Sequence, residues 1–105
     1  MSSLPQFQIQ FRERLADSIA KAERALSAEY APKLALYREP ERIVERLNGI
    51  LQRCTLLRSL LLFPMGIREF NELLRNEIDF VRGAELFLDE LGLYQPAALG
   101  ATAAV

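Results

Sequence analysis

The chain has 105 residues, of which half are apolar, a formal net charge of -1 and no histidine. This length suits a single domain, and the near-neutral charge excludes the strong positive field typical of proteins that bind nucleic acids or anionic membranes. The lack of histidine excludes histidine-dependent catalytic triads and histidine-bearing zinc or di-iron sites.

The first periodic segment lies near the N-terminus. Residues 6–11 alternate between polar and apolar like a strand, but the sequence contains no second alternating run to pair with them. From Phe11 onward the apolar residues are spaced by three and four, at Phe11, Leu15, Ile19, Ala22, Leu26 and Tyr30. Because this spacing is typical of one face of a helix, the sequence predicts a helix over residues 6–29.

A connector and a second helix follow. Pro32 and Pro40 bracket a short segment, and proline disfavours helical geometry in the residue before it, so we expect a connector with one helical turn. Pro40 opens a helix whose apolar seam alternates in steps of four and three, at Ile43, Leu47, Ile50, Cys54, Leu57 and Leu61. Further apolar groups predict that its last turns are deeply buried or form an interface, through Leu56, Leu60, Leu62 and Phe63.

The break at residues 63–66 separates this helix from a third one, predicted over residues 67–91 and ended by Gly92 as a C-cap. The two helices should form an antiparallel hairpin. Residues 95–105 are small and low in complexity, which predicts a disordered tail and leaves residues 1–94 as one domain. The predicted fold is all-α, an antiparallel bundle of three long helices plus a short connector helix, which dimerisation could complete.

Two charged residues, Arg58 and Glu77, fall inside otherwise apolar helix faces, where each needs a partner if it is buried. An antiparallel hairpin that turns near Pro64 sets Glu77 beside Arg53 and Arg58 beside Asn71. We therefore expect a structural ion pair between Arg53 and Glu77, and a contact from Arg58 to Asn71 or to an acceptor outside the chain.

The two halves of this hairpin differ in charge. Residues 46–68 carry four arginines and no acid, whereas residues 69–90 carry seven acids and two arginines. This asymmetry favours the hairpin itself, and it could also form a bipolar surface that steers a charged protein partner.

Gly49 and Gly83 fall inside predicted helices, where each costs about 1 kcal/mol relative to alanine. We expect close helix approach to compensate, with a partner's side chain as the alternative. Cys54 is the only cysteine and should behave as a small buried hydrophobe. A lone cysteine, together with the absence of a signal-peptide pattern or a membrane-spanning apolar run, predicts a reducing, cytoplasmic location. Arginine strongly outnumbers lysine, which is typical of high-GC bacterial genes.

The sequence contains no glycine-rich phosphate loop, and its carboxylate pairs lie at spacings common on solvated helix faces. We therefore expect no cofactor, no metal and no enzymatic activity. The favoured function is a protein-interaction module, such as an adaptor, dedicated chaperone or inhibitor, that binds another protein or forms a homodimer. Its predicted partner-binding residues are Leu56, Leu60, Leu62, Phe63 and Arg58.

An alternative function is a small-molecule sensor or carrier with a pocket between the helices. In this hypothesis Arg58 or Glu77 supplies the polar anchor, and the pocket is lined by Phe70, Phe80, Phe87 and Tyr37.

Overall fold

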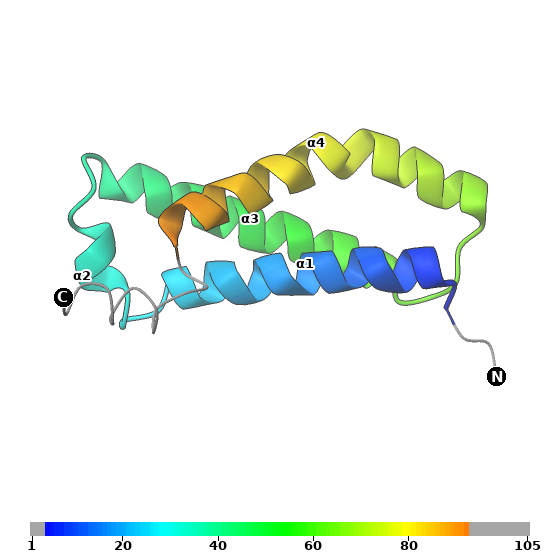
Figure 1. The fold of residues 1–105 in the computed structure, drawn as a ribbon, viewed down its shortest axis with the longest axis horizontal. Coiled ribbons are helices and arrows are strands. Elements are labelled where there is room, and N and C mark those ends of the chain that lie inside the picture. The colour runs from blue at the N-terminus through cyan, green and yellow to red at the C-terminus, as the bar shows by residue number, and fades with distance from the viewer. Residues whose placement is uncertain (1–3, 93–105) are drawn as a thin grey trace.

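The computed structural model describes residues 4–92, a range that contains four helices and no strand. These are α1 (Gln6–Ala25), α2 (Ala31–Leu34), α3 (Pro40–Leu60) and α4 (Ile67–Leu91). Figure 1 shows α1, α3 and α4 running lengthwise along an elongated molecule, with α2 at one end and the turn between α3 and α4 at the other. The predicted all-α bundle of three long helices and a short connector helix is confirmed. The tail predicted over residues 95–105 lies outside the described residues.

The closest helix packing is between α1 and α3, which run antiparallel along most of their length (Figure 1). The predicted seam of α3 faces α1 and is almost completely buried from Leu47 to Leu61. The facing residues of α1 are equally buried, namely Phe11, Leu15, Ala22 and Ala25. Since burial of one large apolar side chain contributes about 1.5–3 kcal/mol, this two-helix interface is the main source of stability.

Helix α4 completes the bundle and buries Phe70, Val81, Ala84, Leu88 and Leu91. The Phe70 ring contacts Phe7 and Phe11 of α1, with ring centroids 4.7 and 5.8 Å apart. The backbones of α3 and α4 lie farther apart than those of α1 and α3. The expected antiparallel hairpin is therefore present, but its two helices are splayed.

Helix α1 ends at Ala25, four residues before the predicted boundary. Its last turn tightens because the Ser27 backbone N–H and hydroxyl both donate to the Arg24 carbonyl, at 3.1 and 2.6 Å. The chain then turns to bury Tyr30, and Pro32 lies in the first turn of α2, where proline is tolerated. The connector thus contains the expected single helical turn, which is α2.

The C-terminus of α4 is closed in two ways. Gly92 adopts the left-handed conformation, with φ of 65°, and its N–H donates to the Asp89 carbonyl at 2.9 Å, so the predicted glycine C-cap is confirmed. The Lys33 ammonium donates to the Leu91 carbonyl at 3.0 Å. This bond satisfies one of the carbonyls that a helix end leaves free, and it ties α2 to α4.

Gln8 joins the beginning of α1 to the turn between α3 and α4. Its side chain is fully buried, and its Nε2 donates to the carbonyls of Leu61 and Phe63, at 3.0 and 2.6 Å. The Met65 backbone N–H donates in return to Gln8 Oε1, at 3.2 Å. One amide group therefore satisfies three backbone groups of the turn.

Replacing Gln8 should destabilise the protein strongly. Gln8→Ala leaves two carbonyls and one N–H of the turn without their partner, so we expect the free energy of unfolding to fall by about 3 kcal/mol. Urea denaturation followed by circular dichroism measures this change. Gln10→Ala is the matched control, because Gln10 is exposed on the same helix, and it should cost less than about 0.5 kcal/mol. Equal effects of the two substitutions would contradict this role of Gln8.

Candidate functional site

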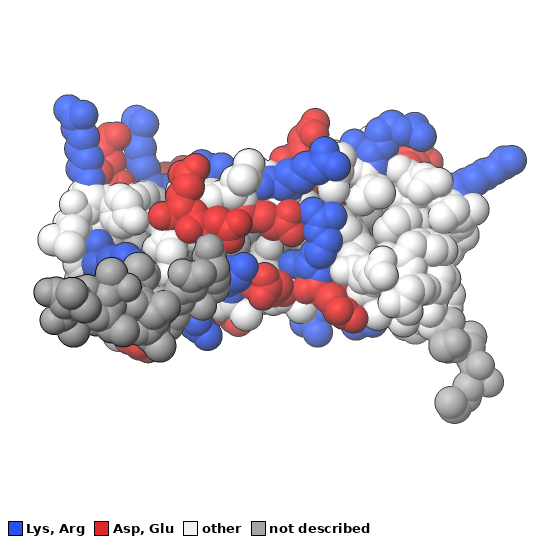
Figure 2. Space-filling model, in the orientation of Figure 1, with Lys and Arg blue, Asp and Glu red and all other residues white. Residues whose placement is uncertain are grey.

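Large apolar side chains are exposed mainly where α3 turns into α4. Four of the predicted partner-binding residues are at least half exposed, at 55% for Leu56, 52% for Leu60 and Leu62, and 77% for Phe63. Ile67, at 53%, extends the group, and we call these five residues the apolar end. On the face shown in Figure 2, uncharged side chains dominate this end of the molecule, whereas charged ones cover its middle.

Deep burial, one of the two expectations for these residues, is wrong. Helices α1 and α4 cover only the side of α3 that carries Leu57 and Leu61, which are buried. No further element within residues 4–92 covers the remaining sides of this segment. The described part of the chain therefore leaves the five side chains of the apolar end in contact with water.

Arg58 lies on the side of α3 that is next to α1. It is exposed and lies between two shallow hollows of about 380 and 210 Å³, one of which it shares with Leu62 and the other with Arg12. The expected contact with Asn71 is wrong, because Arg58 is directed toward α1 and Asn71 is exposed on α4. Because Arg58 is exposed, it does not need the partner that a buried charge would require.

Arg12 adds a second guanidinium to this region. Its Nε atom is buried and has no hydrogen-bond partner among residues 4–92. A buried N–H without an acceptor is unfavourable. Arg12 and Arg58 both line the smaller hollow, so an anionic group bound there would interact with two positive charges. The sequence pattern did not indicate Arg12, since its place beside Arg58 depends on how α1 and α3 pack.

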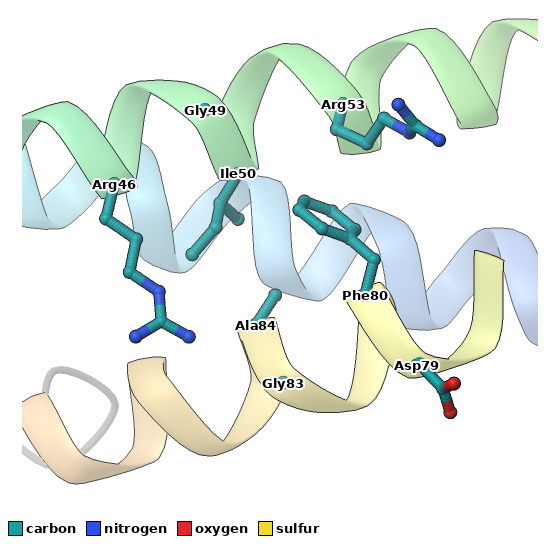
Figure 3. Close-up of a pocket in the computed structure, with 8 residues that line it drawn as sticks. All are labelled: Arg46, Gly49, Ile50, Arg53, Asp79, Phe80, Gly83 and Ala84. Carbon is teal, nitrogen blue, oxygen red and sulfur yellow. The ribbon is translucent and has the colours of Figure 1, made fainter.

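A groove of about 450 Å³ separates α3 from α4. Figure 3 shows its walls, with Arg46, Gly49 and Arg53 on α3 and with Asp79, Phe80 and Gly83 on α4. A Cβ atom added at Gly49 or Gly83 would meet no atom within 4 Å. The expected close helix approach at these glycines is therefore wrong, because they lie beside open space between the splayed helices.

The aromatic residues of the proposed carrier pocket are not gathered in one place. Phe70 packs against α1. The Phe80 ring centroid lies 5.8 Å from the guanidinium carbon of Arg53, and that of Phe87 lies 4.2 Å from the guanidinium carbon of Arg46. Tyr37 packs against the core from the connector. These contacts satisfy the rings without an enclosed cavity.

Arg53 and Glu77 meet across the α3–α4 groove. Arg53 Nε and Nη2 donate to Glu77 Oε1 at 2.9 and 2.6 Å, and Nη2 also donates to Oε2 at 2.7 Å. The Glu77 side chain is mostly buried, at 16% exposure, whereas that of Arg53 is 48% exposed. The structure thus brings together the two residues of the expected ion pair.

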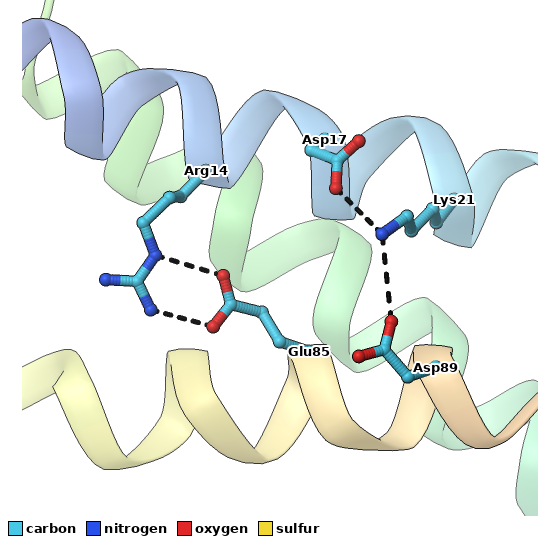
Figure 4. A network of polar contacts seen from close by, with 5 residues as sticks. All are labelled: Arg14, Asp17, Lys21, Glu85 and Asp89. Atoms are coloured by element: carbon cyan, nitrogen blue, oxygen red, sulfur yellow. Dashed lines mark hydrogen bonds and ion pairs between the residues drawn. The ribbon is translucent and has the colours of Figure 1, made fainter. Parts of the chain in front are cut away.

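A second polar network joins α1 to α4 (Figure 4). Arg14 forms a two-pronged contact with Glu85, at 3.0 and 2.7 Å, and this hydrogen bonding raises the pKa of Arg14 above its ordinary value. The Nζ atom of Lys21 lies 2.8 Å from Asp17 Oδ2 and 3.8 Å from Asp89 Oδ1. These contacts fix the side of α4 that faces α1.

No protein-family model, curated protein or solved structure matches this chain. Within residues 4–92, no three side chains of histidine, cysteine, aspartate or glutamate gather in a way that could hold a metal ion. In the same range, none of the helices combines the length and the apolar character needed to cross a bilayer. The features that remain as candidates for a function are the apolar end, the hollow lined by Arg12 and Arg58, and the α3–α4 groove.

The contact between Arg53 and Glu77 should be measurable as a coupling energy. Because Glu77 is mostly buried, Arg53→Ala leaves a carboxylate poorly solvated, and a double-mutant cycle with Glu77→Ala should give about 1 kcal/mol of coupling. The exposed contact between Glu39 and Arg42, at 3.4 Å, is the matched control and should give less than about 0.3 kcal/mol. Urea denaturation of the single and double variants tests both values. Equal coupling in the two pairs would contradict the expected effect of burial.

Cys54 should be chemically inert in the folded protein. Burial raises the pKa of its thiol to about 11, and the negative charge of Glu85 adds to this effect. We expect alkylation by iodoacetamide at pH 8 to be at least about a hundredfold slower in native protein than in urea. Because the folded-state pKa exceeds the ordinary value of 9.0, the thiol's contribution to stability is complete below pH 9 and declines toward pH 11. Comparable alkylation rates with and without urea would show that the thiol is accessible.

Proposed function

We propose that this chain is a non-catalytic protein-interaction module, of the kind found in adaptors, dedicated chaperones and inhibitors, that binds its partner through the apolar end. The exposure of the apolar end is the observation that carries this proposal. Five large apolar side chains are exposed near one turn of the fold, and exposed apolar groups that cluster on a protein surface mark interaction sites. A partner that covers these side chains removes them from water, which supplies the driving force for binding.

The charged groups beside the apolar end support a partner with an acidic group. Arg58 shares a hollow with Leu62, and its guanidinium group makes no ion pair or hydrogen bond with any residue in the range 4–92. Arg12, whose Nε lacks an acceptor in that range, lines the adjoining hollow. A carboxylate of the partner that entered between the two guanidinium groups would gain charge-assisted hydrogen bonds, while the leucines beside it supplied apolar contact.

The partner is another protein, a second copy of this chain, or both, and we propose that binding takes place in the reducing environment of the cytoplasm. The buried thiol of Cys54 is consistent with such a location. Binding through side chains of α3 and the turn after it needs no rearrangement of the α1–α3 core.

A photo-crosslinking experiment tests the proposed function. A benzophenone amino acid at position 63, in the full chain expressed in its native host, should form one discrete covalent adduct that mass spectrometry identifies. Position 36 is the matched control, because Leu36 is 86% exposed and is separated from the apolar end by the length of α3. Adduct formation at position 36 should be at least about tenfold lower.

A second substitution links the adduct to the apolar surface. Leu62→Lys keeps a long side chain but places a charge beside Arg58, so it should reduce the adduct at position 63 by at least about tenfold. Circular dichroism should show unchanged helix content, because Leu62 lies outside α3 and is half exposed. Equal adducts at positions 36 and 63, or an adduct that Leu62→Lys leaves intact, would overturn the proposal.

A further inference from the structure

The outer side of α3 has a second regular stripe in addition to the buried seam. Its residues are Arg42, Arg46, Gly49, Arg53, Leu56 and Leu60, each of which directly precedes a residue of the seam. All six are exposed, and those at positions 46, 49 and 53 line the α3–α4 groove. This stripe combines three positive charges with two exposed leucines and contains no acid.

Helix α4 has a matching stripe of opposite charge. It follows the same spacing of three and four, at Glu69, Glu72, Asn76, Asp79, Gly83, Leu86 and Glu90. Asp79 and Gly83 line the α3–α4 groove, and Leu86 is 64% exposed. The stripe contains four acids and no base, and one of these acids, Asp79, lines the groove opposite Arg46 and Arg53.

The groove contains space that the described residues do not use. Gly49 and Gly83 lie inside long helices, neither has a positive φ, and a side chain at either position would meet no atom within 4 Å. The fold of the described chain therefore does not require glycine at either position. Two helix-weakening residues on facing walls would be favourable if another chain approaches closely there.

The two stripes together form a surface that we call the α3–α4 face. We infer that this face binds a second copy of this chain, with α3 of each copy lying antiparallel on α4 of the other. This inference rests on the proposed function and deepens it by naming one partner and the face that it covers. In a two-fold arrangement the same surface patch serves both copies, so the surface must be complementary to itself. A face with one basic and one acidic helix meets this requirement when each helix lies on its opposite.

The register of the helices supports specific contacts in such a dimer. Arg53 lies level with Glu77 within one chain. A two-fold axis parallel to the helices leaves the position of each residue along that axis unchanged. Arg53 of one copy therefore comes within one helical turn of Asp79 of the other, and Arg42 comes within one turn of Glu90. The alternative, with α3 on α3 and α4 on α4, places like charges opposite one another and is disfavoured.

The size of the face also fits a second copy. A stable interface covers about 800 Å² on each partner, and helices of 21 and 25 residues are about 30–40 Å long, which is sufficient when two lie side by side. Leu56, Leu60 and Leu86 supply exposed apolar groups along this length. The glycines allow the two helix layers to approach near the middle of the groove.

Sedimentation equilibrium of the full chain tests the inference. We expect a species of twice the 11.9 kDa chain mass at micromolar concentration. Gly49→Leu and Gly83→Leu place a large side chain in the groove and should each weaken dimerisation by at least about tenfold. Ala20→Leu is the matched control, since Ala20 is exposed on α1, and it should leave the dimer intact. Circular dichroism should show that all three variants retain their helices.

A charge-reversal experiment tests the pairing of α3 with α4. Arg42→Glu and Glu90→Arg should each weaken the dimer at least about tenfold when present alone, whereas an equimolar mixture of the two variants should form a heterodimer of near wild-type affinity.

A monomeric wild type, dimerisation that the glycine variants leave unchanged, or a mixture of the charge variants that stays monomeric would each overturn the inference. The proposed function fails separately, through the adducts at position 63. A monomeric chain that still forms the specific adduct would lose the second copy as its partner and keep its role in protein interaction.

Discussion

The buried amide of Gln8 is the constraint on which the arrangement of the other elements depends. It satisfies a buried carbonyl of Leu61 and partly buried backbone groups of Phe63 and Met65 as the chain reverses between α3 and α4. By fixing this turn against α1, it directs Leu61 inward and leaves Leu62 and Phe63 exposed. The same contact therefore sets the direction of α4 and presents the apolar end to the solvent.

Much of the fold could be predicted because it depends on periodicity and on strong local signals. Apolar residues at spacings of three and four mark the sides of α1 and α3 that face each other, and Gly92 marks the end of α4 because only glycine readily adopts its backbone conformation. The meeting of Arg53 and Glu77 follows from the register of an antiparallel hairpin whose turn is short. In each case the information lies in one helix or in two consecutive ones.

The remainder could not be predicted because it depends on how many helices surround each position. A helical wheel places Arg58 inside an apolar face, but no third helix among residues 4–92 covers that flank of α3, so the side chain is exposed. A helical wheel also does not show that α3 and α4 are splayed. Because they are, Gly49 and Gly83 border open space instead of allowing close contact between the two helices. Gln8 was missed for a related reason, since a polar residue in an alternating segment gives no sign of the distant carbonyls that it will bind.

The ion pairs that hold α4 have a consequence for its response to the solvent. Helices α1 and α3 associate through apolar burial, whereas α4 adds to its own buried face three charge contacts, those of Arg14, Lys21 and Arg53. Dissolved ions screen partly exposed charges over a Debye length of about 8 Å at physiological ionic strength, but they hardly weaken apolar packing. Concentrated electrolyte therefore loosens one helix of this bundle in preference to the other two, and that helix is the one that supplies Asp79 and Gly83 to the α3–α4 groove.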